Sequence, residues 1–315
     1  MIHPSHPDPA AHLVAPHLLL VAAELRAQGH SLAASYRGVR EGRLITIRRG
    51  VFMETETWNA LSPTQQHTAH LQAFHRTHGS DYLFSHTSAA HLHGWALLRR
   101  EPRLHISGDP RPGGNPPGVS RHHLPDAAAH ATLLEHGLPA TTVVRTLADC
   151  LCQPMTPLAA LILADSALHH GTPADQVRDL LETTDRCHGV RRALAALSLA
   201  DPRAASPAES FARHLIHTHG LPRPELQVLV PTARGRRYLD LGWPQLRLGL
   251  EVDGRAKYFE HGPTAEVVFQ ERQREKDIMA EGWHLLRTDW PEMRDHPTTL
   301  IRRLSEAIIL RRAMR

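Results

Sequence analysis

Two short apolar segments near the C-terminal end of the chain each carry one acidic residue, and they constrain the fold more than any other feature. Residues 238–240 end in Asp240, and residues 248–254 place Glu251 among leucine, glycine and valine. The interval between the two acids accommodates a turn at residues 243–245 and a second, neighbouring strand. We therefore expect two adjacent strands that bring Asp240 and Glu251 together at one end of a sheet.

Converging carboxylates suit the hydrolysis of phosphodiester bonds. A hard cation takes carboxylate oxygens as ligands, activates water and neutralises the charge that develops on phosphorus. The sequence therefore predicts Asp240 and Glu251 as ligands of Mg²⁺ or Mn²⁺. Lys257 and Lys276 are the only lysines among 36 basic residues. The compact charge of a lysine suits the positioning of water or a phosphate oxygen, and we expect this role for Lys257.

A purely structural interpretation of the same acids stays open. Asp–Gly pairs such as Asp253–Gly254 are common in turns. Glu251 is harder to explain in this way, because it lies in a run that otherwise resembles a buried strand. A carboxylate there must be paired, bound to metal or placed at the end of the strand.

The residues around the two acids predict an ordered series of elements: helix, three strands, helix, strand, helix. The third strand is followed by a helix and a further strand, so we expect a mixed sheet flanked by helices within a multidomain α+β or α/β chain. The predicted elements are helix 207–219, strands 226–230, 237–241 and 246–253, helix 264–281, strand 283–288 and helix 297–311.

The N-terminal residues predict a small winged helix that binds DNA. Residues 17–28 have helical apolar spacing, a second helix follows Ser31, and residues 44–53 form a hairpin. In a winged helix the second helix lies in the major groove and the hairpin tip reaches phosphate. The alternative is an ordinary solvated face, which the paired arginines at the tip argue against. The predicted DNA contacts are Arg37, Arg40, Arg48 and Arg49.

These patterns divide the chain into three predicted regions. Residues 1–58 form an N-terminal arm and the winged helix, residues 59–200 a mixed, mainly helical middle region, and residues 201–315 the sheet with the two acids. The 26 histidines lack the Cys/His spacing of a zinc site, which favours solvated side chains over metal ligands. Ser85–His86 and residues 120–122 lack the partners of a Ser/His hydrolase.

Composition limits the classes of protein further. Three cysteines make no disulfide framework, so a reducing cytoplasm is expected. The apolar run at residues 18–23 is far shorter than the roughly 20 residues that span a bilayer, and we expect neither an export signal nor a membrane segment. The sequence pI near 9.3 reflects local clusters of arginine that would attract nucleic acid.

The C-terminal part resembles the PD-(D/E)XK nuclease core, and more closely an uncharacterised bacterial family related to very-short-patch repair endonucleases. The likeness lies in SPAESFARHL with Glu209, RRYLDLGWP with Asp240, LEVDGRAKY with Glu251, and the segment ERQREKDIMAEGWHLLRTDW. The first fifty residues, with the hairpin GRLITIRRGVF, are similar to the N-terminal domain of abortive-infection type IV antitoxins.

The resemblance implies a restriction-endonuclease-like αβββαβ core, with Asp240 and Glu251 as metal ligands and Glu209 as a third acid at the same site. The usual lysine two positions after the second acid is Asp253 here. Its positive or polar role would pass to Lys257, Gln270 or Lys276, and Asp253 would add a further contact near the metal. Along the DNA backbone the expected contacts are Arg255, Arg272 and Arg274.

Two functional hypotheses follow. The first is a DNA-binding protein with a Mg²⁺-dependent endonuclease-like domain that hydrolyses phosphodiester bonds. The alternative is a non-catalytic, antitoxin-type transcriptional regulator of a defence or toxin–antitoxin system, in which the nuclease fold is a scaffold. The pair Asp240 and Glu251 favours the first, and the missing motif lysine favours the second. The expected partners are DNA and, on the second hypothesis, a toxin or defence protein.

Overall fold

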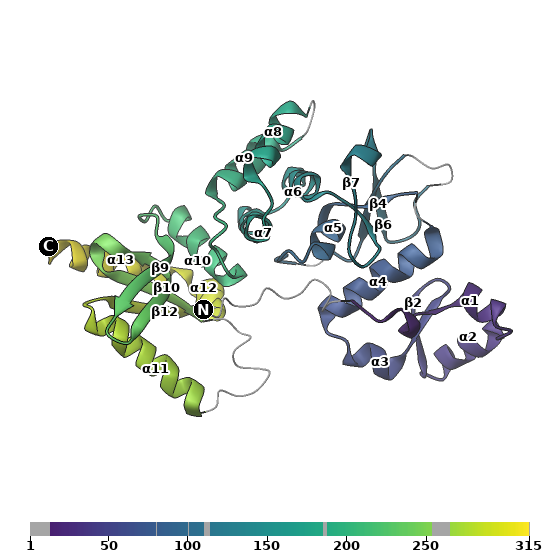
Figure 1. Ribbon diagram of the computed structural model, residues 1–315, viewed down its shortest axis with the longest axis horizontal. Coiled ribbons are helices and arrows are strands. Elements are labelled where there is room, and N and C mark those ends of the chain that lie inside the picture. The colour runs from purple at the N-terminus through teal and green to yellow at the C-terminus, as the bar shows by residue number, and fades with distance from the viewer. Residues whose placement is uncertain are drawn as a thin grey trace. The chain divides into compact units, whose positions relative to one another are not determined.

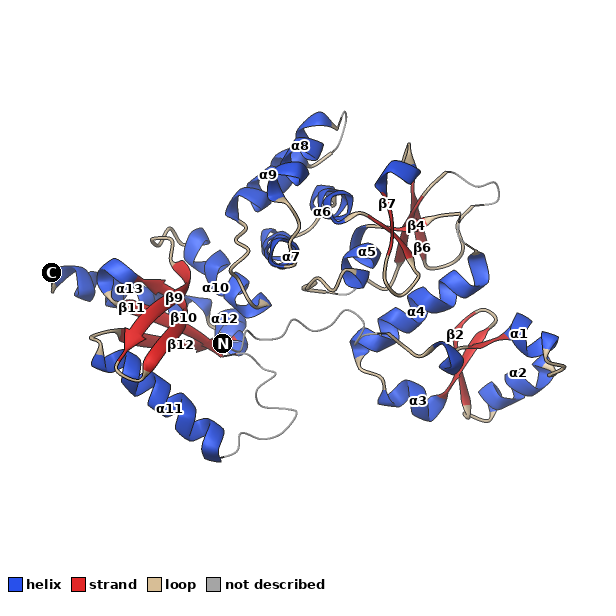
Figure 2. Cartoon of the chain, viewed as in Figure 1, coloured by secondary structure: helices blue, strands red, loops and turns tan. Residues whose placement is uncertain are grey.

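The computed structural model describes residues 13–79, 81–99, 101–109, 114–184, 188–253 and 265–314. For residues 265–268 it describes the backbone alone. Contacts group the chain into two compact units. Unit 1 comprises Met1–Gln153 and Asp175–His188, and unit 2 comprises Pro154–Ala174 and Gly189–Arg315 (Figure 1). Both units contain helices and strands (Figure 2). The protein therefore has a multidomain, mixed α+β fold.

The N-terminal part of unit 1 is a three-stranded antiparallel sheet with short helices. The sheet has the order β1-β3-β2, so β3 pairs with both neighbours. Helix α2 begins after Ser31, whose side chain accepts a hydrogen bond from the Ala33 amide. The elements are η2 (Pro16–Leu18), β1 (Leu20–Val21), α1 (Ala22–Ala27), α2 (Leu32–Arg40), β2 (Leu44–Arg48), β3 (Val51–Glu54), α3 (Thr55–Ala60) and α4 (Pro63–His78).

The predicted helix over residues 17–28 is wrong in its first half. The helix starts only at Ala22, because Leu20 and Val21 pair with Phe52 and Val51 of β3 instead. The strand conformation gives these residues ladder hydrogen bonds and buries Val21 in a core shared with α4. Tertiary pairing therefore overrides a local helical pattern, and the resulting short strand ties the N-terminal segment to the hairpin.

The rest of unit 1 contains a five-stranded sheet, although helices still outnumber strands in the region that was predicted to be mixed and mainly helical. Its order is β6-β5-β4-β8-β7. Only the strand over residues 103–107 was predicted, since all five strands have just two to four residues and show little alternation. The elements are β4 (Leu83–Phe84), α5 (His86–Leu92), β5 (Leu104–Ser107), β6 (Val119–His122), η3 (Ala127–His130), β7 (Ala131–Leu133), β8 (Pro139–Thr141), α6 (Val143–Cys152) and α8 (Ala174–Thr183).

Unit 2 contains the predicted helix–strand series. Its sheet has the order β12-β11-β10-β9, with β11 and β12 parallel and the other pairs antiparallel. The predicted element order is confirmed, and α12 is an addition. The elements are α7 (Pro157–His169), α9 (Val190–Leu199), α10 (Pro207–Thr218), β9 (Glu225–Thr232), β10 (Gly235–Trp243), η4 (Pro244–Leu246), β11 (Leu248–Asp253), α11 (Ala265–Ala280), β12 (His284–Asp289), α12 (Trp290–Asp295) and α13 (Pro297–Ala313).

Two apolar cores cover the two faces of this sheet. Helices α10, α12 and α13 pack on one face over Leu241, Leu248 and Leu250. Ile278 of α11 packs on the other face with residues of β9 and β10. Gly249 faces this second core, where an added Cβ would lie 2.8 Å from Leu285. A larger residue at this position of β11 would therefore require the side chains of Leu285 and Leu239 to shift.

Helix α7 belongs to unit 2, although the sequence assigned it to the middle region. Asp165 of α7 is buried and accepts hydrogen bonds from Arg213 at 2.6 Å and from Ser210 at 2.7 Å, both on α10. The Asp201 amide donates to the same carboxylate at 2.8 Å. Burial raises the pKa of Asp165. This satisfied ion pair fixes α10, the helix that carries Glu209, against α7.

No helix among the described residues is both long and apolar enough to cross a membrane.

Candidate functional site

Asp240 and Glu251 stand side by side where the pairing of β10 and β11 ends. The ladder runs from Trp243 and Leu248 to its last pair, Leu241 and Leu250. Asp240 and Glu251 are the next residues on the two strands. The Val252 amide donates a hydrogen bond to Asp240 Oδ2 at 2.8 Å, so a side chain replaces the main-chain ladder at this point.

The ladder on the other side of Asp240 is interrupted as well. Strands β9 and β10 pair at Leu239 with Val228 and at Leu241 with Leu226, and they leave out the pair between Asp240 and Gln227. Gln227 has a φ of 51°, a left-handed conformation that is uncommon for a residue other than glycine. Strained backbone of this kind persists where the surroundings impose it, often at functional sites. Asp240 therefore lies where the regular pairing of β10 is interrupted toward both β9 and β11.

The electrostatics of this region agree with carboxylates in close proximity. Burial and the charge of Asp240 raise the pKa of Glu251 to about 7. The same two causes, burial first, raise the pKa of Glu209 to about 7. Asp240 is thus close enough to disfavour the ionised form of both glutamates. A cation bound here would relieve this repulsion, so the region favours positive charge at neutral pH.

Glu209 lies in the first turn of α10, and its carboxylate is held by its own helix terminus. It accepts hydrogen bonds from the Ala205 amide at 3.0 Å, from Ser206 Oγ at 2.8 Å and from Gln227 Nε2 at 3.2 Å. Ser206 in turn caps the helix by accepting from the Glu209 amide. Both oxygens of Glu209 therefore have partners, which orients the carboxylate near Asp240 without leaving it free.

Arg274 of α11 provides the positive charge beside Glu251. Its Nη2 donates to Glu251 Oε1 at 3.1 Å and Oε2 at 3.2 Å, and also to the Tyr238 carbonyl. The sequence predicted that Arg274 contacts the DNA backbone, whereas in the structure its guanidinium binds this carboxylate. Sequence reasoning missed this role, because only the position of α11 beside β11 reveals it.

The helical phase of α11 separates the other candidates for the missing motif lysine. Gln270 precedes Arg274 by one turn and shares its face of the helix. Lys276 is exposed, and two residues correspond to about 200° of rotation from Arg274. Arg272 is also exposed. Lys257 and Arg255 lie outside the described residues, so their predicted roles stay predictions.

Asp253, the residue in the position of the usual lysine, is bound by an arginine of β12. Arg287 donates through Nε to Asp253 Oδ2 at 3.1 Å and through Nη2 to Oδ1 at 2.5 Å. This two-point contact raises the pKa of Arg287. Both oxygens of Asp253 are therefore engaged by Arg287, as both oxygens of Glu251 are by Arg274.

The donor chemistry of Asp240 and Glu251 fits a hard divalent cation, since both are carboxylates that disfavour each other's charge. The three acids do not form a tight cage. Among the described residues, the set of three ligand atoms within 4.8 Å of one another consists of histidines and not of these carboxylates. Asp240 and Glu251 would therefore hold the ion, with Glu209 beside them.

The four arginines of the predicted DNA surface divide into two kinds. Arg37 and Arg40 on α2 are exposed, as is Arg49 at the hairpin tip. Arg48 is half-buried: its guanidinium lies 5.0 Å from the centre of the Phe74 ring. Its Nη2 donates to the Pro117 carbonyl at 3.3 Å, and burial lowers its pKa. Arg48 thus packs the hairpin against α4, while Arg49 is exposed at its tip.

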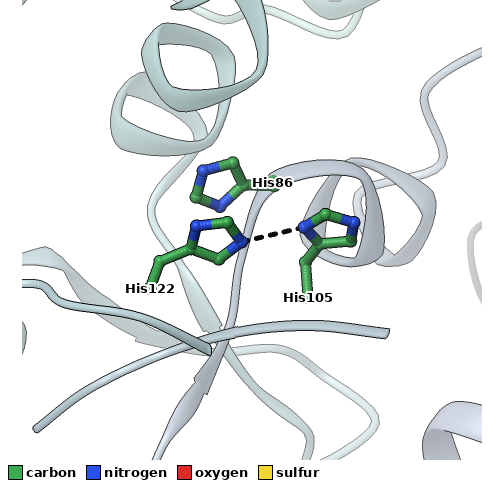
Figure 3. Close-up of side chains that lie close together, drawn as sticks. All are labelled: His86, His105 and His122. Carbon is green, nitrogen blue, oxygen red and sulfur yellow. Dashed lines mark hydrogen bonds between the residues drawn. The ribbon is translucent and has the colours of Figure 1, made fainter. Parts of the chain in front are cut away.

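The structure also brings together histidines that the sequence did not connect. His86, His105 and His122 form a cluster in unit 1 (Figure 3). His86 and His105 are buried, which corrects the expectation of solvated histidines at these positions. The three residues are far apart in sequence, and each alone shows no ligand spacing.

Comparison with known proteins yields distant relatives. No family model matches the chain. Two curated relatives, Uncharacterized protein MT2308 and Uncharacterized protein Rv2248, come from two strains of Mycobacterium tuberculosis. Each is 31% identical over 118 residues, which are 37% of this chain and 42% of the relative. The crystal structure of the RV2827C protein from the same species aligns with a TM-score of 0.39 and 18% identity, over 62% of this chain and 75% of that one.

Proposed function

We propose that this chain is a DNA-binding protein whose C-terminal unit is a PD-(D/E)XK-like nuclease that hydrolyses phosphodiester bonds with Mg²⁺ or Mn²⁺. The observation that carries the proposal is the position of Asp240 and Glu251. They are neighbours at the end of one ladder, and the charge of Asp240 helps raise the pKa of Glu251 to about 7. Two half-buried like charges side by side destabilise a fold, whereas a cation-binding site needs them.

In this proposal Asp240 and Glu251 hold the metal ion. When bound, the ion would polarise the scissile phosphate and lower the pKa of a water molecule. Arg274 fixes the orientation of Glu251 through contacts to both of its oxygens. It also places positive charge beside Glu251. Gln270, on the same face of α11, and Lys257 are the candidates for orienting the attacking water.

The N-terminal part of unit 1 would supply affinity for DNA. Arg37, Arg40 and Arg49 are exposed on α2 and at the tip of the β2–β3 hairpin. In a winged helix these two elements contact the major groove and the phosphate backbone. DNA is thus the proposed partner, and the contribution of these arginines would be independent of sequence and sensitive to salt.

One observation favours a second candidate function, a non-catalytic regulator of the antitoxin type with a toxin or defence protein as partner. Arg274 already donates to both oxygens of Glu251. A permanent ion pair of this kind satisfies the carboxylate without any metal. If Arg274 stays bound to Glu251 and no metal ion takes its place, the C-terminal unit is a scaffold and only the winged helix acts on DNA.

A plasmid-nicking experiment distinguishes the two functions. Chelator-treated full-length protein is incubated with supercoiled plasmid and Mg²⁺ or Mn²⁺, and nicked and linear products are quantified. The nuclease proposal expects nicking by the wild type and none by Asp240→Asn. The matched control is Asp295→Asn, since Asp295 is an exposed aspartate whose partner is Arg294 on the same helix.

Each outcome decides between the functions. Nicking by wild type and Asp295→Asn, but not by Asp240→Asn, supports the nuclease. Nicking that survives in Asp240→Asn comes from another site or a contaminant and removes the proposal. If the wild type does not nick single- or double-stranded DNA with either ion but still binds DNA, the regulator becomes the better proposal.

A further inference from the structure

The histidine cluster of unit 1 lies apart from the acids in the sequence and is made of different ligands. His86 begins α5, His105 lies on β5, and His122 ends β6. Each offers one ring nitrogen, and the three nitrogens lie within 4.8 Å of one another (Figure 3). Within the described residues, no other trio of histidine, cysteine or acidic side chains has this spacing.

The local fold explains how residues so far apart in sequence meet. Strands β5 and β6 are parallel, with His105 opposite Ser120 and Ser107 opposite His122. His105 and His122 are therefore diagonal neighbours on one face of the sheet. The Ser85 amide donates to the His105 carbonyl at 3.0 Å, which anchors the start of α5 next to β5.

His86 is held in a strained backbone conformation at this junction. Its φ is 50°, in the left-handed region that residues with a Cβ seldom adopt. Such a conformation is energetically unfavourable, and it persists only where the surrounding structure imposes it. Here it accompanies the placement of the His86 ring directly over the ring of His122, with 3.7 Å between their centres. The cluster is therefore maintained at the expense of local backbone energy.

The protonation state of the cluster suits metal binding. Burial, followed by the charges of the neighbouring histidines and Arg145, lowers the pKa of His86 well below its usual value. Burial and His105 likewise lower the pKa of His122 to about 4. Neutral imidazole is the form that binds metals. Arg145 is paired with Asp149 at 2.9 Å, so Glu101 beside His105 leaves one negative charge next to the neutral rings, which favours a cation.

Two of the rings have supporting hydrogen bonds on the nitrogen that would not bind metal. Ser85 Oγ lies 3.0 Å from His86 Nδ1, and Glu101 Oε2 lies 2.8 Å from His105 Nε2. The second contact makes His105 Nε2 a donor and leaves the lone pair on Nδ1. His105 Nδ1 points at His122 Nε2, 2.9 Å away. A carboxylate behind a metal-ligating histidine is a recurrent arrangement that fixes the ring and strengthens the ligand.

We infer that His86, His105 and His122 form a binding site for a zinc-type divalent transition ion, with a fourth position for water or a small anion. Three imidazoles without thiolate or carboxylate ligands favour zinc over Mg²⁺ or Ca²⁺. Two nitrogens on one tetrahedral zinc ion are about 3.3 Å apart. The distance of 2.9 Å between His105 and His122 therefore has to open only slightly, and the stacked His86 ring has to turn.

The experiment is zinc titration of chelator-treated full-length protein against a chromophoric chelator, together with the visible spectrum after Co²⁺ replaces zinc. One equivalent of tightly bound zinc per chain and the intense absorption of four-coordinate Co²⁺ are expected. His122→Ala should lose this equivalent. His122 is only half-buried, so this variant should fold, as circular dichroism would verify. Glu101→Gln should weaken zinc binding by roughly 10- to 100-fold.

Two control variants make the result specific. The chain has 26 histidines, so weak surface binding must be separated from the site. His123→Ala removes the exposed histidine next to His122 and should retain the full equivalent. Asp240→Asn alters the carboxylate site of unit 2 and should also retain it. If zinc binds only weakly, or binds equally to wild type and His122→Ala, the three histidines are a hydrogen-bonded core network and the inference is wrong.

Discussion

The acidic group of unit 2 and the histidine group of unit 1 respond to burial in opposite ways. Burial and like charge raise the pKa of Glu209 and Glu251 to about 7, so these acids resist ionisation. In unit 1 the same causes lower the pKa of His122 to about 4, so its ring resists protonation. The first group favours a hard cation that neutralises charge. The second offers neutral lone pairs to a softer one, so burial together with like charge would favour different metals at the two proposed sites.

The largest expected effect is the loss of nuclease activity when one carboxylate of the acidic group is replaced, with no change in zinc binding by the histidine group. Glu251→Gln removes one of two charged ligands but keeps the shape of the side chain. Nuclease activity should fall by at least about 10³-fold, because one carboxylate is too little to hold a hard cation during the reaction. Single-turnover cleavage of a labelled duplex measures this loss, and zinc binding by the same variant should be unchanged. A simultaneous loss of zinc would mean that the two groups are not independent.

Substitution of Arg274 tests whether its positive charge assists cleavage at the acidic group. Arg274→Gln should lower cleavage by roughly 10²-fold, as expected when one charged group that stabilises the reacting phosphate is lost. Lys276→Gln is the matched control, since Lys276 is exposed on the same helix and turned away from Arg274. Faster cleavage by Arg274→Gln would instead show that the arginine competes with the metal for Glu251.

The opposite pKa shifts predict that the stabilities of the two units depend on pH in opposite ways in metal-free protein. Glu209 has a pKa of about 7 in the fold against 4.5 ordinarily, so it binds its proton more tightly when folded. Its stabilising contribution is present below pH 4.5 and is lost as the pH rises to about 7. His122 has a pKa of about 4 against 6.5, so its contribution is present above pH 6.5 and is lost toward pH 4.

As the pH rises from 5 to 6.5, unit 2 should therefore lose stability by on the order of 2 kcal/mol for each such glutamate, while unit 1 gains stability by a smaller amount, because solvent screens half-buried His122. Hydrogen exchange, corrected for intrinsic rates, can follow β10 and β5 separately in chelator-treated protein. Glu209→Gln should reduce the pH dependence in unit 2 alone, with Glu251 supplying the remaining slope. Parallel slopes in both units would contradict the contrast between the two groups.

The smallest expected effect concerns DNA contact, which should involve neither metal group. Arg49→Ala should weaken binding to all sequences alike and reduce the salt dependence by about one unit, as for one lost phosphate contact. Arg48→Ala should mainly lower the free energy of unfolding, because its guanidinium packs on Phe74. Fluorescence anisotropy over a salt series measures the first effect. An unchanged slope for Arg49→Ala would assign this arginine to an ordinary solvated surface.

The sequence predicted the acidic group better than the histidine group for a physical reason. Asp240 and Glu251 lie on consecutive strands, so alternation and one turn bring them together. The histidines depend on a parallel pairing of two short strands and on the start of α5, which no local pattern encodes. Arg274 was missed for a similar reason, because its partner lies on a different element.

Other differences come from tertiary pairing. Residues 20 and 21 have helical spacing but form a strand, because the hairpin offers them backbone partners. Arg48 has the charge of a phosphate ligand, yet the ring of Phe74 lies within its reach. The αβββαβα order of unit 2 was predictable, since each of its strands is long enough to show a pattern. The five-stranded sheet of unit 1 was not predictable as a whole, because its strands are short.

The division of the chain between the units has a consequence for its synthesis. Helix α7 belongs to unit 2, and α8 returns to unit 1 before α9 and α10 follow. As the polypeptide leaves the ribosome, α7 therefore emerges well before the helix whose Arg213 neutralises Asp165. The apolar surface of α7 and the carboxylate of Asp165 therefore stay exposed until α10 has been synthesised. Premature termination within this interval would leave a helix without a partner, a natural target for chaperones and proteases.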